Sequence, residues 1–77
     1  MNSFELKPKK GYGFIYMYTS PSDKSYIGQT IRSLSERAQK NGNGYVGCPI
    51  FFRAIQKYNF ENFKYQILGE FKIEDLD

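Results

Sequence analysis

Two tyrosines and one arginine are the residues of this sequence whose types and spacing suggest chemistry. Tyr16 lies in an alternating run, Tyr26 lies in a second short run, and Arg37 lies in a segment with a helical pattern. A phenol ionises near pH 10, so it acts as a base only where a cation or metal stabilises the phenolate. If the three side chains converge, Tyr16 can draw a proton from water and Tyr26 can position the water or a phosphate. Arg37 can then stabilise the charge that develops on a phosphodiester.

The two tyrosine runs have the pattern of a β-hairpin. Residues 14–18 alternate between the two sides of a strand, and Ser20–Asp23 supply turn chemistry before residues 25–28. The sequence therefore predicts a hairpin over roughly residues 13–28.

The register of this hairpin decides which side chains meet. If Tyr18 pairs with Lys24, then Tyr16 lies opposite Tyr26 and the two rings share one face. Gly28 closes the second strand on that face and leaves room for a backbone or a ligand to approach.

A short helix is expected after the hairpin. Ser33 and Glu36 have the spacing of a capping box, which predicts a helix from about residue 33 to residue 40. Leu34 and Ala38 then point inward. The helix ends at Asn41–Gly44, because Asn and Gly tolerate left-handed backbone conformations.

A second helix and a third strand complete the predicted fold. Pro49 suits the first turn of a helix that Asn59 caps, and Phe63 begins a strand that alternates to Ile67. The apolar stripe of this helix is Ile50, Phe51, Ala54, Ile55 and Tyr58. The acidic residues after Ile73 predict the start of a further helix there. We expect an α+β fold of order β-β-α-α-β, with a three-stranded antiparallel sheet flanked by helices.

Composition limits the classes of site. The chain has 77 residues, which is one small domain, with one cysteine and no histidine. An intramolecular disulfide and a zinc site of the usual ligands are therefore excluded. Seven tyrosines and seven phenylalanines must provide much of the core.

Positive charge is concentrated in the first part of the chain. Residues 1–60 hold nine Lys and Arg against three Asp and Glu, whereas residues 61–77 hold two against five. This distribution suits a polyanionic partner, although a solvated basic surface has the same composition. Residues 1–12 read as a flexible basic lead-in, or as an arm that touches phosphates. No transmembrane run or signal-peptide core is present, which predicts an intracellular protein.

Structural roles compete with the catalytic ones. A strand tyrosine is usually a packing residue, and an arginine on a short helix is usually solvated. Arg32 is an alternative to Arg37, and Tyr18 or Tyr45 is an alternative to either phenol.

Several short blocks of this sequence, in the order in which they occur along the chain, resemble the GIY-YIG nuclease family over about residues 13–70. The blocks are Phe14–Tyr16, Tyr26–Thr30, Leu34 with Glu36 and Arg37, Ala54–Tyr58, and Asn62–Phe63. The resemblance implies a nuclease-like domain over residues 13–77. Members most similar in these blocks are intron-encoded homing endonucleases and phage relatives, which implies a cytoplasmic protein encoded by a bacterium or a phage.

The resemblance also implies an activity and roles. It implies a DNA endonuclease domain that uses a divalent metal, Mg²⁺ by analogy. Tyr16 is then the general base or the residue that helps to activate water, Tyr26 is the second-motif tyrosine, and Arg37 stabilises the phosphate. The substrate-binding residues expected alongside them are Lys24, Gly28, Arg32 and Asn41.

The sequence departs from the family pattern at three places. Phe14 takes the position of the first-motif glycine, with Gly13 one place earlier, and Asn41 takes a position where many members have histidine or tyrosine. Asparagine can bond to a phosphate or water but cannot accept a proton. The family's metal-binding glutamate is expected beyond Asp77, which predicts a C-terminally incomplete domain, and a separate DNA-recognition domain is absent from the sequence.

Two other classes of function compete with the nuclease. One is a non-catalytic nucleic-acid-binding module, in which Tyr16, Tyr18 and Tyr26 stack on bases while lysines track the phosphates. The other is a protein-interaction domain descended from a nuclease, with its aromatic face buried against a partner.

Overall fold

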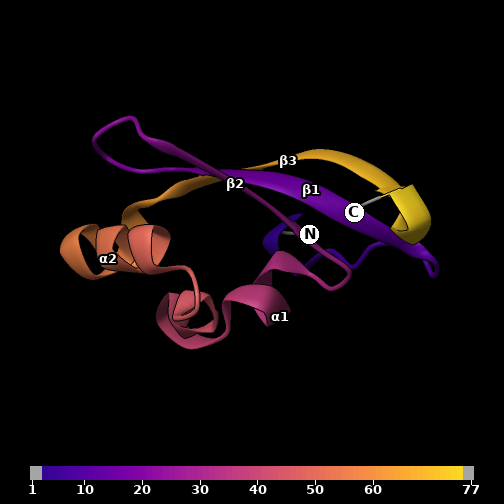
Figure 1. Ribbon diagram of the computed structural model, residues 1–77, viewed down its shortest axis with the longest axis horizontal. Helices are drawn as coiled ribbons and strands as arrows, with labels where there is room; N and C mark the ends of the chain where they lie inside the picture. The colour runs from indigo at the N-terminus through magenta and orange to yellow at the C-terminus, as the bar shows by residue number, and fades with distance from the viewer. Residues whose placement is uncertain (1–2, 76–77) are drawn as a thin grey trace.

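A three-stranded antiparallel sheet, with helices packed on one face, forms the domain (Figure 1). The computed structural model describes residues 3–75. Its main elements are β1 (Tyr12–Thr19), β2 (Ser25–Thr30), α1 (Leu34–Ala38), α2 (Pro49–Tyr58) and β3 (Lys64–Lys72). Short 3-10 segments lie at Ser3–Glu5, Lys40–Tyr45, Phe60–Asn62 and Ile73–Asp75. The predicted α+β class and the β-β-α-α-β order are confirmed.

The central strand is β1, and the sheet order is β2-β1-β3. Tyr18 pairs with Tyr26, and Tyr16 pairs with Gly28. The prediction that Tyr16 lies opposite Tyr26 is therefore wrong. Because the register differs from the predicted one by two residues, both tyrosines still point to the helix-covered face.

The turn between β1 and β2 explains the shift in register. Thr19 and Ser25 form the last strand pair, so Lys24 belongs to the turn and does not pair with a strand residue. The backbone N–H of Ser20 donates to the carbonyl of Lys24 at 2.8 Å, and the N–H of Lys24 donates to Ser20 Oγ at 3.1 Å. Asp23 adopts a positive φ of 67°, which Asp tolerates better than most residues.

The helix α1 is capped as expected but is shorter. Ser33 Oγ accepts a hydrogen bond from the backbone N–H of Glu36 at 3.1 Å, and Leu34 and Ala38 are fully buried. The helix ends at Ala38, two residues before the predicted end, because Gln39 leaves the helical region with a φ of 58°. The chain then turns through the 3-10 segment Lys40–Tyr45.

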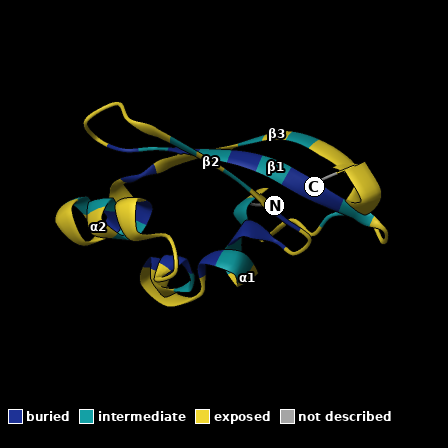
Figure 2. Ribbon diagram, viewed as in Figure 1, coloured by how far each residue is buried: buried dark blue, intermediate teal, exposed yellow. Residues whose placement is uncertain are grey.

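The buried residues lie where the sheet and the helices face one another (Figure 2). They form one core cluster in which most side chains are aromatic. Tyr18 and Tyr45 are each 1% exposed, and Phe51 and Ile55 supply the buried side of α2. Ile50 was expected in this stripe, but it is 76% exposed. It lies in the first turn of α2, where the helix borders a cleft and not the core.

The N-terminal segment packs on the domain over its described part. Phe4 contacts the rings of Phe60 and Tyr65, with centroids 6.0 and 5.2 Å away. Lys7 forms an exposed ion pair with Glu36 at 3.7 Å. Residues 3–12, expected as a flexible lead-in, thus include a packed aromatic anchor.

Near the other end, Ile73–Asp75 form a 3-10 turn where the start of a further helix was expected. Asp77, beyond which the metal-binding glutamate was expected, lies outside the described residues. None of the helices within residues 3–75 has the length and apolar character that crossing a membrane requires.

Candidate active site

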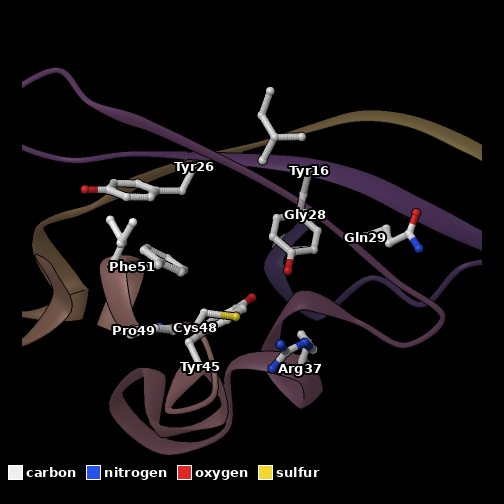
Figure 3. A pocket seen from close by; sticks show the side chains of 11 residues that line it. Tyr16, Tyr26, Gly28, Gln29, Arg37, Tyr45, Cys48, Pro49 and Phe51 are labelled. Carbon is white, nitrogen blue, oxygen red and sulfur yellow. The ribbon is translucent and has the colours of Figure 1, made fainter. Parts of the chain in front are cut away.

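A cleft of about 470 Å³ opens between the β1–β2 hairpin on one side and the start of α2 on the other (Figure 3). Tyr16, Tyr26, Gly28 and Arg37 all contribute to its lining. The hairpin supplies the first three residues and α1 supplies the fourth. The three predicted catalytic residues therefore line one concave surface.

Tyr16 has a buried ring and a hydroxyl that points into the cleft (Figure 3). The residue is only 4% exposed. Its hydroxyl lies directly over Gly28, since a Cβ atom built on Gly28 would stand 2.5 Å from it. Gly28 is thus the residue that makes space for the Tyr16 hydroxyl.

Three phenols lie close together in the interior behind this hydroxyl. The Tyr45 hydroxyl donates to the Tyr18 hydroxyl at 3.5 Å, and the rings of Tyr16 and Tyr45 meet edge to face with centroids 6.5 Å apart. Burial is the main cause that raises the pKa of Tyr16 well above 10, and the neighbouring Tyr45 raises it further. Burial also raises the pKa of Tyr18 to about 12. Tyr16 is therefore a neutral phenol at physiological pH.

Arg37 is held at the cleft by the segment that follows α1. Its guanidinium lies 4.4 Å from the centre of the Tyr45 ring, in cation–π contact, and one guanidinium nitrogen donates to the carbonyl of Gly44. Gly44 is needed for this approach, because a Cβ there would collide with the backbone carbonyl of Arg37. The arginine is half-buried and fixed in direction before any ligand binds.

Tyr26 lines the same cleft in a different orientation. Its ring stacks on Phe51, with centroids 4.8 Å apart and an interplanar angle of 24°. In Figure 3 its hydroxyl points away from the hydroxyl of Tyr16 and from Arg37. The structure thus brings Tyr16 and Arg37 together, whereas Tyr26 contributes mainly its ring to the wall.

The predicted substrate-binding residues are spread over several places. Gly28 lies in the cleft, while Lys24 is exposed in the β1–β2 turn and Arg32 is exposed after β2. Asn41 has a positive φ of 55° and lines a separate hollow with Asn59 and Gln56. Neither Lys24, Arg32 nor Asn41 lines the cleft that holds Tyr16.

Tyr45 is the site residue that the sequence did not single out. It appeared there only as an alternative phenol, yet it contacts both Tyr16 and Arg37. Its signal in the sequence is slight: an aromatic residue between two glycines, just before a helix. Only the path of Lys40–Tyr45 back toward β1 gives it this position.

The expected divalent metal does not fit the described residues. Within residues 3–75, no three Asp, Glu, Cys or His side chains are grouped so that they could hold a metal ion. The residues that line the cleft include no carboxylate.

Comparison of the chain with protein-family models, with curated proteins and with solved structures gives no match.

Proposed function

We propose that this chain is a GIY-YIG-type DNA endonuclease domain that hydrolyses phosphodiester bonds. The observation that carries the proposal is the meeting of Tyr16, Gly28 and Arg37 at one cleft. These residues are distant in sequence, and their types were expected at a phosphodiester site before the fold was known. Cytoplasmic DNA of a bacterium or a phage is the proposed setting.

Arg37 is the phosphate-stabilising residue in this proposal. A guanidinium presents several N–H donors in one plane, which suits the non-bridging oxygens of a phosphate. Because Tyr45 and Gly44 fix its direction, little reorganisation is needed when negative charge develops in the transition state. This electrostatic contribution is the main one expected from the chain's own residues.

Tyr16 orients the attacking water or a phosphate oxygen. A phenol whose pKa is raised by burial keeps its proton at pH 7, so it serves better as a fixed hydrogen-bonding group than as a phenolate base. Its hydroxyl shares the cleft with Arg37, so a water bonded to it approaches the phosphate that the arginine binds. Hydrolysis forms a bond between the oxygen of this water and phosphorus and breaks the P–O bond to the leaving sugar oxygen. One proton of the water passes through solvent to that leaving oxygen.

The proposed binding partner is DNA. A divalent cation, Mg²⁺ by analogy with the family, is supplied in the activity assay.

Nicking of supercoiled plasmid tests the proposal. The purified chain is incubated with plasmid in Mg²⁺ or Mn²⁺, beside Tyr16→Phe, Arg37→Ala and the matched control Arg53→Ala, whose side chain is exposed on α2. We expect Tyr16→Phe and Arg37→Ala each to slow nicking by roughly 100-fold, and Arg53→Ala to nick at the wild-type rate. Intact plasmid with the wild-type chain in every metal, or full activity of Arg37→Ala, would show that the assignment is wrong.

A non-catalytic nucleic-acid-binding module is the second candidate. It is favoured by the exposed apolar residue Ile50, which lies at the cleft with the Tyr26–Phe51 pair. Tyr16 and Tyr18 are too buried to stack on bases, so only Tyr26 of the three expected tyrosines remains for that role. DNA binding without nicking, unchanged by Tyr16→Phe, would support this candidate.

A further inference from the structure

The cleft beside Arg37 has unusually apolar walls for a site that meets DNA. Tyr26 and Phe51 form a stacked pair along it, and Ile50 reaches it from α2. Arg37 is the only cation among the residues that line it. One charged group therefore lies beside a hollow suited to a flat apolar ligand.

One of these wall residues is highly exposed. Ile50 is 76% exposed, although it is a large aliphatic residue, and it lies at the cleft beside the half-buried Tyr26. Apolar side chains gathered at a concave surface mark binding sites more often than isolated ones do. Ile27 is 67% exposed, but it follows Tyr26 in β2, so its side chain points to the opposite face of the sheet.

We propose that this cleft receives one unstacked base of the DNA substrate, with the neighbouring phosphate at Arg37. The substrate class is then single-stranded or locally unpaired DNA. This inference rests on the proposed function in that it takes DNA as the ligand.

Unpaired DNA fits the apolar walls of the cleft better than duplex DNA does. A duplex presents phosphates and sugars outward and keeps its bases stacked inside, so a phosphate docked at Arg37 would leave the apolar walls against water. An unpaired base has an apolar face, and contact of such faces with aromatic side chains favours single-stranded binding whatever the base. The cleft volume of about 470 Å³ falls in the range of small-molecule sites.

Binding without metal tests this inference separately from cleavage. Fluorescence anisotropy compares three labelled ligands: a single-stranded oligonucleotide, an abasic oligonucleotide of equal length and charge, and a fully paired duplex. We expect the single strand to bind roughly 10-fold more tightly than the abasic strand, since the phosphates are matched and only the bases differ.

Substitution of the exposed wall locates the effect. Ile50→Ser should remove most of the difference between the normal and abasic strands. Ile31→Ser is the matched control, because Ile31 is 59% exposed and does not line the cleft. Both changes are at exposed positions, so we expect the same circular dichroism spectrum as the wild type.

The outcomes separate this inference from the proposed nuclease activity. Equal affinity for normal and abasic strands, tighter binding of the paired duplex, or wild-type discrimination by Ile50→Ser would each overturn the base site. Discrimination without nicking would leave the base site standing and contradict the nuclease. Nicking of plasmid without discrimination between the normal and abasic strands would overturn the base site and support the nuclease.

Discussion

The hydroxyl of Tyr16 occupies the space that a side chain at Gly28 would need. The two residues are partners across β1 and β2, and a Cβ on Gly28 would stand 2.5 Å from the Tyr16 hydroxyl and 2.7 Å from Cζ. A real Cβ almost never comes so close to another heavy atom. The position of this phenol in the cleft therefore depends on the glycine opposite to it.

Gly28→Ala should consequently displace Tyr16. We expect nicking to fall by roughly 100-fold, because a misplacement of about 1 Å is sufficient for such a loss. The free energy of unfolding should fall by about 1–3 kcal/mol from overpacking. Gly47→Ala is the control, since a Cβ at Gly47 meets nothing within 4 Å. Nicking of Gly28→Ala at the rate of Gly47→Ala would contradict the dependence.

The hydrogen bond between Tyr45 and Tyr18 should appear as a coupling energy. Tyr18→Phe removes the acceptor and leaves the buried Tyr45 donor unpaired, which costs about 1–3 kcal/mol of unfolding free energy. In a Tyr45→Phe background that donor is already gone, so the same change should cost about 1 kcal/mol less. Urea denaturation of the two single variants and the double variant measures this difference. Additive effects, as expected for the distant pair of Tyr12→Phe and Tyr45→Phe, would show that no such bond exists.

Arg37→Lys should not restore the function that Arg37→Ala loses. Lysine keeps the positive charge, but it lacks the planar guanidinium that lies on the Tyr45 ring and donates to Gly44. We expect both variants to nick roughly 100-fold more slowly than the wild type, with little change in melting temperature. A lysine variant with near wild-type nicking would reduce the role of Arg37 to that of a point charge.

Alkaline pH should destabilise the fold through its buried phenols. Burial raises the pKa values of Tyr16, Tyr18 and Tyr45 in the folded state, whereas in the unfolded chain they stay near 10. Below pH 10 both states are protonated and the stabilising contribution is fully present. Between pH 10 and the raised folded values only the unfolded chain loses protons, so each phenol lowers the unfolding free energy by about 1.4 kcal/mol per pH unit.

Urea denaturation from pH 8 to pH 12 measures this slope. Tyr18→Phe should reduce the slope above pH 10 by about a third, since it removes one of the three titrating groups. Tyr12→Phe, at a half-buried residue at the start of β1, serves as the comparison. A Tyr18→Phe variant with the wild-type slope would contradict burial as the cause.

Local features of the fold were predictable because each depends on a few neighbouring residues. The alternation around Tyr16, the cap at Ser33 and the proline at the start of α2 each predicted an element that the structure contains. The register of the hairpin was not predictable from alternation alone. A shift of two residues keeps every side chain on its face, so only the geometry of the Ser20–Lys24 turn distinguishes the two pairings.

The sequence by itself determined the element order and the residue types that a phosphodiester site needs. Tertiary structure decided which of them meet: it placed Tyr16 over Gly28, turned the Tyr26 hydroxyl away and inserted Tyr45 beneath Arg37. The physical reason is the separation in sequence of the residues that interact. Strand and helix patterns arise from residues a few positions apart, whereas the cleft forms where β1, β2 and the 3-10 segment Lys40–Tyr45 pack together, and no local pattern encodes that packing.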